Sequence, residues 1–193
     1  MLATLVLTSA LLAPVEPKTE PVKWEIDPNH SEISFRIRHF VSRVPGTFTQ
    51  WNGMIFADPA KLSDGSVEVT IQTASISTKN DRRDADLRSA NFFAADSFPT
   101  ITFKSNKVEV KGSNITLSGD LTMRGVTKPV VLAGEYSGLA GTPEPRKQRI
   151  GFSVSTKVNR IDYGVKWNRV VEGGGVMLGD EVDITINIEA VRQ

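Results

Sequence analysis

Cysteine is absent from this chain of 193 residues, and histidine occurs only twice. The first absence excludes disulfide bonds, thiolate catalysis, cysteine-ligated zinc and iron–sulfur clusters. His30 and His39 lie nine residues apart, so on one uninterrupted strand they would point to opposite faces and could not share a metal ion. We therefore predict no metal site and no cofactor.

Neither sign of charge is in clear excess, because 23 lysines and arginines nearly balance 22 aspartates and glutamates, and the formal net charge is only +1. The chain has no basic cluster interleaved with aromatic residues, so we predict no nucleic-acid partner. The G-x-S-x-G and H-E-x-x-H motifs of hydrolases and metalloproteases are missing as well. These absences favour a binding protein over an enzyme.

The apolar run at residues 2–13 is too short to span a bilayer, which takes about 20 residues. It is typical of the apolar core of a signal peptide, with cleavage after Ala10 or Ala13. Because Leu2 follows Met1 directly and no basic segment precedes the run, we expect the true start to lie upstream. The alternative is a disordered or retained anchoring N-terminus. We thus predict a signal peptide at residues 1–13, a proline-containing linker at 14–22, one domain at 23–193, and a periplasmic or secreted protein that does not span a membrane.

From residue 23 onward the apolar residues alternate with polar ones, as in half-buried strands. Turn residues, including Pro45-Gly46 and Gly112-Ser113, separate the alternating segments. About eight such strands with short connections predict an all-β fold, a closed antiparallel lipocalin-like barrel. One short helix at about residues 79–90, capped by Thr78 with Asp81, would pack on it.

Side chains of one parity should face the barrel interior, where they would either fill a packed core or line a ligand cavity. His39 has this parity, and we interpret it either as a polar group near a ligand headgroup or as an interior histidine hydrogen-bonded to a neighbour. His30 should shape the turn at residues 27–29. The lining candidates are Ile33, Phe35, Ile37, His39, Val67, Val69, Ile71, Ile101, Phe103, Leu117, Leu121, Met123, Phe152, Val154, Ile184 and Ile186.

The predicted helix is dense in charge. We interpret Asp84, Asp86 and Arg88 as an ion-pair network that fixes the helix to the barrel, with Asp84 pairing with Arg88 at i+4. Arg82 and Arg83, near the helix start, are the alternative: they and His39 are candidates for contact with an anionic headgroup.

Three segments carry a resemblance to a known family: W-E-I-D-P-N-H-S at 24–31, R-D-A-D-L-R-S-A-N-F-F-A-A-D-S-F-P-T-I-T-F at 83–103, and G-D-L-T-M-R-G-V-T-K-P-V at 119–130. In this order and spacing they resemble the YceI-like family of exported, lipocalin-like barrels that bind polyisoprenoid or other long-chain lipids. The resemblance implies an open, elongated interior and leaves a homodimer open. The family usually has histidine where this chain has Asp86, so any headgroup contact there differs in chemistry.

These observations predict a non-enzymatic protein that sequesters a long apolar chain, of polyisoprenoid or fatty-acyl type, inside a barrel. Two alternatives remain open at this point. One is a packed barrel that serves as an interaction module without an internal ligand. The other is a lipid-headgroup hydrolase that would use His39 with Asp84 or Asp86 as acid and base.

Overall fold

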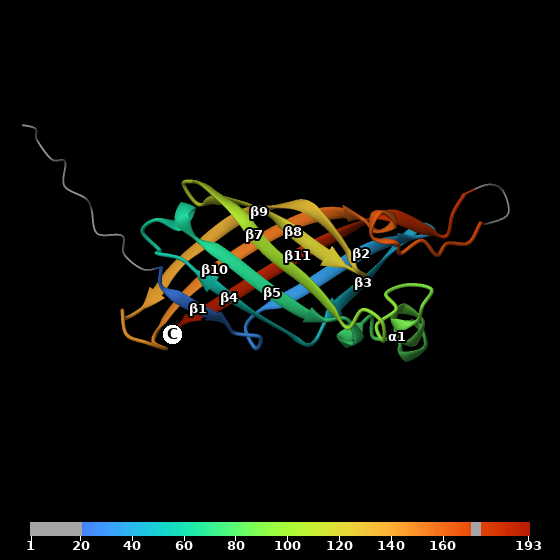
Figure 1. The fold of residues 1–193 in the computed structure, drawn as a ribbon, viewed down its shortest axis with the longest axis horizontal. Helices are drawn as coiled ribbons and strands as arrows, with labels where there is room; N and C mark the ends of the chain where they lie inside the picture. The colour runs from blue at the N-terminus through green and yellow to red at the C-terminus, as the bar shows by residue number, and fades with distance from the viewer. Residues whose placement is uncertain (1–20, 171–174) are drawn as a thin grey trace, which may run out of the picture.

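The computed structural model describes residues 21–170 and 175–193, and its strands form one antiparallel sheet that closes on itself (Figure 1). Neighbouring strands follow the order β1-β4-β5-β7-β8-β9-β10-β11-β2-β3-β6, and β1 also pairs with β11. The strands are β1 (Lys23–Ile26), β2 (Glu32–His39), β3 (Ser42–Phe48), β4 (Trp51–Phe56), β5 (Ser66–Gln72), β6 (Ile76–Ser77), β7 (Thr100–Lys111), β8 (Asn114–Met123), β9 (Val126–Gly141), β10 (Gln148–Asn159) and β11 (Leu178–Arg192).

The eleven strands occupy eight positions around a closed barrel. Strands β1 and β2 both pair with β11, so they form one interrupted strand on its flank. Strand β4 pairs with β1, and β3 pairs with β2. On their other edges, β4 pairs with β5 and β3 pairs with β6. The all-β, closed antiparallel barrel predicted from the alternating pattern is therefore confirmed.

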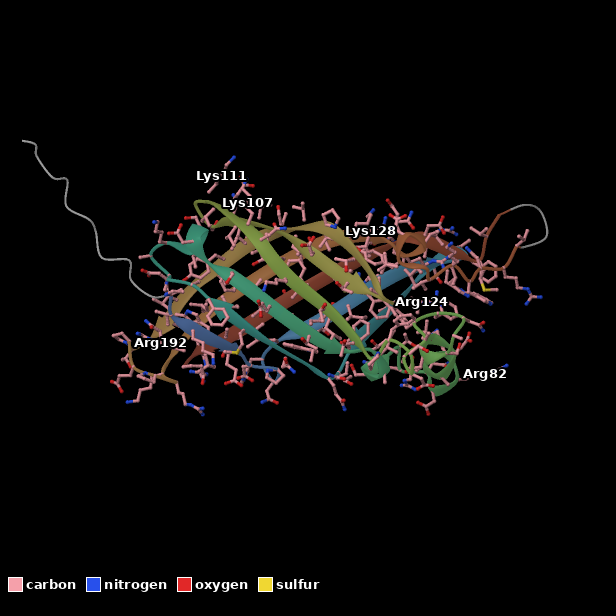
Figure 2. All side chains as sticks on the ribbon, viewed as in Figure 1. Arg82, Lys107, Lys111, Arg124, Lys128 and Arg192 are labelled. Atoms are coloured by element: carbon pink, nitrogen blue, oxygen red, sulfur yellow. The ribbon has the colours of Figure 1, made fainter. Side chains whose placement is uncertain are left out.

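The barrel is long, and its two ends can be told apart by their hairpins and by the helix (Figures 1 and 2). The β7–β8 hairpin with Lys107 and Lys111 marks one end, together with Arg192 near the C-terminus. The helix with Arg82 and the β8–β9 hairpin with Arg124 mark the other. Arg124 and Gly125 both have positive φ, at 51° and 74°, the backbone of a tight two-residue hairpin turn.

The helix, α1 (Asp81–Arg88), is shorter than predicted, and its cap lies elsewhere. Asn80, rather than Thr78, is the N-cap, and its side chain accepts a hydrogen bond from the Arg83 N–H at 3.0 Å. Lys79 has φ of 58°, in the left-handed region, so the helix cannot begin there. Short 3₁₀ turns occur at η1 (Leu62–Asp64), η2 (Thr73–Ser75) and η3 (Arg160–Tyr163).

The turn predicted at Pro45-Gly46 is wrong, because both residues lie within β3. The chain reverses instead between His39 and Ser42, which pair with each other. Gly46 lies opposite Phe35, and a Cβ at Gly46 would overlap the Phe35 ring. The glycine therefore makes room for a neighbouring aromatic ring rather than for a change of chain direction.

The residues directly before β1 and at the C-terminus contact the barrel. Val22, placed in the linker by the sequence, packs against the apolar core, and its carbonyl accepts a hydrogen bond from the Ala57 N–H at 2.9 Å. At the other terminus, the Gln193 N–H donates to the Lys23 carbonyl at 2.9 Å, which ties the last residue to β1. The predicted signal peptide and most of the linker lie outside the described residues. Within the described residues, no helix is long and apolar enough to cross a membrane.

Candidate functional site

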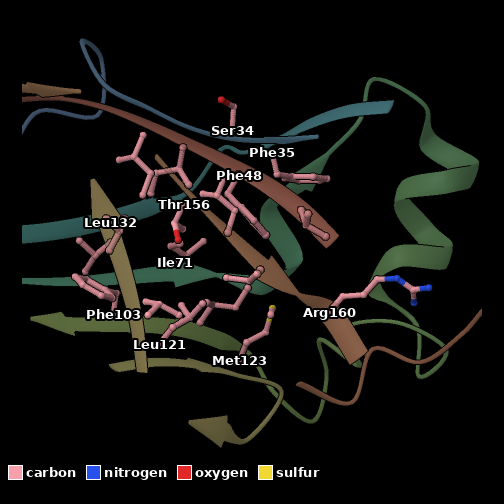
Figure 3. A pocket seen from close by; sticks show the side chains of 18 of the residues that line it. Ser34, Phe35, Phe48, Ile71, Phe103, Leu121, Met123, Leu132, Thr156 and Arg160 are labelled. Carbon is pink, nitrogen blue, oxygen red and sulfur yellow. The ribbon is translucent and has the colours of Figure 1, made fainter. Parts of the chain in front are cut away.

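The barrel encloses a cavity of about 380 Å³ whose wall is built almost entirely of apolar side chains. This volume falls within the range of small-molecule sites, roughly 300–1,000 Å³. Phe35 on β2 lies across it from Phe103 and Leu121, which are paired neighbours on β7 and β8 (Figure 3). The apolar lining follows from the alternating pattern, because each strand sends every second side chain inward.

The predicted lining residues lie on this wall with one exception. Val154 has the same inward parity as Phe152, but its neighbours cover it: it is buried in the main apolar cluster and does not border the cavity. The structure brings the other candidates together on the wall: Ile33, Phe35, Ile37, His39, Val67, Val69, Ile71, Ile101, Phe103, Leu117, Leu121, Met123, Phe152, Ile184 and Ile186. Their contact with a ligand stays a prediction.

One end of the cavity, here called the floor, has tight apolar packing. Trp24 is fully buried, and its indole Nε1–H donates to the Ala57 carbonyl at 2.9 Å. Ile150 and Ala190, paired across β10 and β11, are also almost completely buried. Leu62, at the start of η1, covers this end and contributes to the cavity wall.

The opposite end, here called the rim, is more irregular. Phe92, Val165 and Leu178 form a second, smaller apolar cluster there, with Trp167 and Met177 packed against it and only half-buried. The rings of Phe92 and Trp167 lie 5.2 Å apart between centroids. Arg83 and Asp86 on α1 are exposed and also border the cavity, so the cavity reaches the protein surface at this end.

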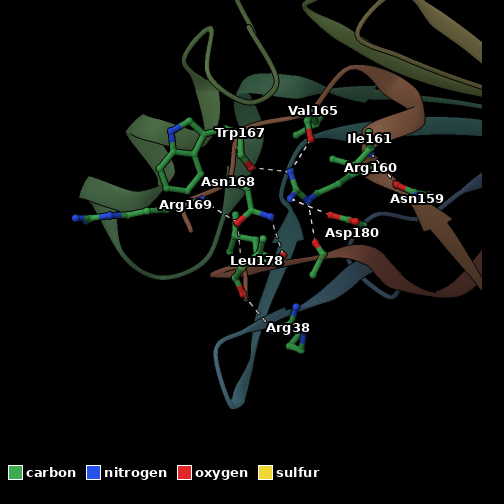
Figure 4. Close-up of polar contacts among 12 residues, drawn as sticks. Arg38, Asn159, Arg160, Ile161, Val165, Trp167, Asn168, Arg169, Leu178 and Asp180 are labelled. Atoms are coloured by element: carbon green, nitrogen blue, oxygen red, sulfur yellow. Dashed lines mark hydrogen bonds and ion pairs between the residues drawn. The ribbon is translucent and has the colours of Figure 1, made fainter. Parts of the chain in front are cut away.

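A buried arginine holds two rim segments, residues 160–170 and 175–180, in place (Figure 4). Arg160 is only 4% exposed and donates to the carbonyls of Gly179 at 2.9 Å, Val165 at 2.6 Å and Trp167 at 2.8 Å. Its Nη2 lies 3.4 Å from the Asp180 carboxylate. Desolvation lowers the pKa of Arg160, and the charge of Asp180 opposes that shift. The guanidinium points away from the apolar side chains of the cavity (Figure 3), so its role is to satisfy loop carbonyls.

Other arginines at the rim act in the same way. Arg124 donates to the carbonyls of Ala90 and Gly164, which joins the β8–β9 hairpin to the segment after α1 and to η3. Arg88 donates to the carbonyls of Ala74 at 2.7 Å and Ile76 at 3.2 Å. Main-chain carbonyls that have no partner in the sheet thus receive charge-assisted hydrogen bonds, which are stronger than neutral ones.

The ion-pair network predicted for Asp84, Asp86 and Arg88 is wrong. Asp84 is 4% exposed, and its carboxylate accepts two hydrogen bonds from Thr78, from the N–H at 2.8 Å and from the hydroxyl at 2.5 Å. Arg88 is committed to carbonyls instead, and Asp86 accepts weak hydrogen bonds from Ser89 and Asn91. The reason is geometric: Thr78 precedes the helix and lies nearer to Asp84 than the i+4 side chain does.

The three headgroup candidates separate in space. Arg83 borders the cavity while its Nε and Nη2 donate to the Thr78 hydroxyl and carbonyl, at 2.6 and 2.9 Å. His39 also borders the cavity, and its ring packs edge-on against Phe40 at 4.7 Å between centroids. Arg82 is exposed on α1 and does not border this cavity, but it lines a second, polar pocket on the helix together with Asn80, Arg83 and Asp86. Within the described residues, no hydrogen bond links His39 to Asp84 or Asp86.

A polar cluster on the side of the barrel contains Asp27, His30 and Glu189, whose ligand-type atoms lie within 4.8 Å of one another. Each group already has a partner: His30 Nδ1 lies 2.8 Å from the Asp27 carboxylate, and Glu189 pairs with Arg149 at 2.7 Å. The hydrogen bond raises the pKa of His30 and lowers the pKa of Asp27. The prediction that His30 shapes this turn is confirmed by the contact with Asp27.

The sequence reading missed most of the rim. Phe92, Trp167 and Met177 border the cavity but lie outside the alternating strands, where no parity argument applies. One feature of the sequence could have indicated Trp167 and Met177. They are large apolar residues in a segment without strand alternation, and such residues usually pack against a buried surface.

Comparisons with known proteins give concordant results. A family model described as the YceI-like domain matches residues 24–190. A UPF0312 protein of Staphylococcus aureus is 37% identical over 164 residues, which cover 84% of this chain and 94% of that protein. The crystal structure of a Campylobacter jejuni YCEI protein is similar with a TM-score of 0.69 and 31% identity, over 81% of this chain and 90% of that one. A polyisoprenoid binding domain from Saccharophagus degradans shares the fold, with a TM-score of 0.67, 15% identity, and coverage of 89% and 99%.

Proposed function

Because this chain belongs to the YceI-like domain family and its barrel encloses an apolar cavity, we propose that it binds one long apolar chain, of polyisoprenoid or fatty-acyl type, without catalysing a reaction on it. The observation that carries the proposal is the cavity itself: inward-facing side chains from strands all around the barrel leave a space of about 380 Å³ between them. A barrel packed solid, as an interaction module would be, has no such space.

The energetics of such a site favour a long ligand. Each methylene group removed from water is worth about 0.8 kcal/mol, so ten of them contribute roughly 8 kcal/mol before other terms. That gross figure corresponds to a dissociation constant of about 1 μM. The loss of translational and rotational freedom on association reduces it. A tightly held ligand therefore needs more than about ten buried carbons.

The polar end of the ligand would lie at the rim. Arg83 uses its Nε and Nη2 on Thr78, which leaves Nη1 available to an oxygen of a ligand at the cavity mouth. His39 and the Asp86 carboxylate border the same end of the cavity. Arg83 favours an anionic group and Asp86 a hydroxyl or amine donor, so this pair supports a head that carries both an acceptor and a donor.

We also propose that the protein works outside the cytoplasm, in the periplasm or after secretion. The support is the apolar run at residues 2–13 followed by prolines, together with a chain that contains no cysteine to oxidise. The Saccharophagus domain with the same fold is described as polyisoprenoid binding, which makes polyisoprenoids the first ligand class to test here.

The decisive experiment is native mass spectrometry of the protein purified from its own host, followed by extraction and identification of any bound lipid. We expect one apolar lipid per barrel. Leu117→Trp places a larger side chain on the cavity wall and should abolish lipid retention. Val131→Trp, on the exposed face of β9, is the matched control and should retain it. A lipid-free wild type, or equal lipid in the two variants, would contradict the proposal.

A further inference from the structure

Exposed apolar side chains gather at the rim. Six large apolar residues of the described chain are exposed, and two of them, Val131 and Leu139, are isolated on β9. The other four come from two neighbouring segments, and Val41 is fully exposed while Val170 is 76% exposed. We call these four residues the rim patch: Phe40, Val41, Val170 and Val176.

The two segments of the rim patch are joined to each other. The Phe40 N–H donates to the Met177 carbonyl at 2.8 Å, and Val170 forms a β-bridge with Val176. Arg38 Nη1 lies between the segments and donates to the carbonyls of Phe40 at 3.2 Å and Val176 at 3.4 Å. The four apolar side chains therefore belong to one held surface rather than to two independent loops.

The rim patch borders the mouth of the cavity. His39, directly before Phe40, lies on the cavity wall, and so does Met177, directly after Val176. Trp167 on the wall precedes Val170 by three residues. A surface that covered the rim patch would thus lie against the opening through which a ligand enters.

The sequence around the rim patch carries an excess of positive charge. Residues 36–43 and 164–179 contain five cations (Arg36, Arg38, Arg43, Lys166 and Arg169) and one acidic residue, Glu172, although the whole chain carries only +1. Arg43 pairs with Asp183, whereas the other four cations form no ion pair within the described residues. Arg169 extends away from the loop's polar cluster (Figure 4).

We propose that the rim patch docks on an anionic phospholipid surface and that the cavity ligand passes between the bilayer and the barrel there. Exposed apolar side chains enter the boundary between headgroups and acyl chains, and cations beside them pair with anionic headgroups. The docking stands on the rim patch and its charge, whereas the passage of ligand rests on the proposed function.

A bilayer fits these features better than a protein partner does. Four apolar side chains on narrow tips provide little of the roughly 800 Å² per partner that a stable protein interface buries. An excess of cations matches a uniformly anionic surface. A bilayer also offers an apolar medium to a ligand that leaves an apolar cavity, so that the ligand need not cross water.

The test is co-sedimentation of the full chain with vesicles of phosphatidylcholine alone or of phosphatidylcholine and phosphatidylglycerol in equal parts. We expect binding to the anionic vesicles only, weakened by added salt. Val41→Asp combined with Val170→Asp should reduce partitioning about tenfold or more, because it removes apolar contact and adds charge repelled by the lipid. Lys166→Gln and Arg169→Gln should each reduce it about fivefold.

Matched controls separate the rim patch from the rest of the surface. Val131→Asp on β9 and Lys111→Gln at the opposite end should sediment like the wild type. Residues 1–20 are present in every variant, so any membrane affinity of that segment is a constant background. No preference for anionic vesicles, or an equal loss in the β9 control, would overturn the docking proposal.

The two proposals fail separately. The rim variants leave the cavity wall unchanged, so they should retain bound lipid in native mass spectrometry while they lose vesicle binding. Vesicle binding by a barrel that never contains lipid would support docking and overturn the passage of ligand. Lipid in the barrel without vesicle binding would overturn docking and leave the binding function intact.

Discussion

The two ends of the barrel are stabilised by different interactions. At the floor, apolar side chains such as Trp24 and Ile150 are buried to 0% and 1% exposure. At the rim, the backbone leaves the sheet, and Arg88, Arg124 and Arg160 donate to its carbonyls. Apolar packing predominates at the floor. Hydrogen bonds from long side chains instead hold the rim loops in position while the centre of the rim stays open.

This difference assigns stability and ligand binding to separate regions. Floor residues contribute mainly to the free energy of unfolding, because their burial is complete and tightly packed. Rim residues shape the cavity mouth at a smaller cost in stability. The following experiments test that division, beginning with the largest expected effect.

The strongest test compares a tryptophan from each end. Trp24→Ala should lower the free energy of unfolding by about 3–5 kcal/mol, since it removes a fully buried ring and its hydrogen bond to Ala57. Trp167→Ala should cost about 1–2 kcal/mol, because that ring is only half-buried. Urea unfolding measures the stability of both variants, and native mass spectrometry measures how much lipid each retains. Equal destabilisation by the two changes would remove the distinction between floor and rim.

Phe35, on the wall between the ends, tests whether the interior is hollow. Phe35→Ala should cost about 1.5–3 kcal/mol, less than a packed core position, because part of the ring faces the cavity. Phe35→Trp should fit with little loss of stability but weaken lipid binding by occupying the space. Gly46→Ala should also weaken lipid binding, because its methyl group displaces the Phe35 ring. A severe stability loss for Phe35→Trp, with no lipid detected, would favour a packed barrel.

Asp84 tests how the helix is attached at the rim. Asp84→Ala should cost roughly 1–3 kcal/mol, because it leaves the buried N–H and hydroxyl of Thr78 without their acceptor. Arg82→Ala, on the exposed face of the same helix, should change stability by less than about 0.5 kcal/mol. Thermal melting of both variants gives the comparison. A parent-like melt for Asp84→Ala would show that Thr78 finds another acceptor.

The smallest effect is expected on the side of the barrel, at the Asp27–His30 contact, away from both ends. Asp27 has its pKa lowered, so its contribution is present above its ordinary value of 3.8 and is lost as the pH falls through the lowered pKa. His30 has its pKa raised, so its contribution is present below 6.5 and is lost as the pH rises through the raised pKa.

The melting temperature should therefore be slightly higher between the lowered pKa of Asp27 and the raised pKa of His30. His30→Gln should remove the decline in melting temperature on the alkaline side of this range. The titration of His30 followed by NMR gives its pKa directly. An His30 pKa at or below 6.5 would contradict the expected stabilisation, and a change in lipid retention over the same pH range would show that the contact is coupled to the cavity.

The barrel could be predicted from the sequence because its wall follows one rule. Alternation places Ile33, Phe35 and Ile37 on one face, and the closed sheet turns that face inward. The same rule failed for Val154, because parity gives direction but not what covers a side chain. The alternation also could not show whether the interior is filled or hollow, because that depends on how side chains from opposite strands meet.

The rim was hardly predictable, and its arginines show why. Arg88 and Arg160 bind main-chain carbonyls, which every residue possesses and no residue type reveals. A charge pattern on a helix instead suggested a pairing of Asp84 with Arg88. Gly46 misled for a related reason, since a glycine next to a proline is typical of a turn, whereas here it accommodates the ring of Phe35.

The apolar floor gives the cavity a direction. A linear ligand enters with its apolar tail first and its polar head last, because apolar side chains pack at the floor while charged side chains border the rim. The distance from floor to rim then selects ligands by the length of their tails. A tail shorter than the cavity leaves empty space at the floor, and a longer tail keeps the polar head outside the cavity mouth. The part of the molecule nearest the exit is always its head, so any acceptor must take hold of the head before the tail can follow.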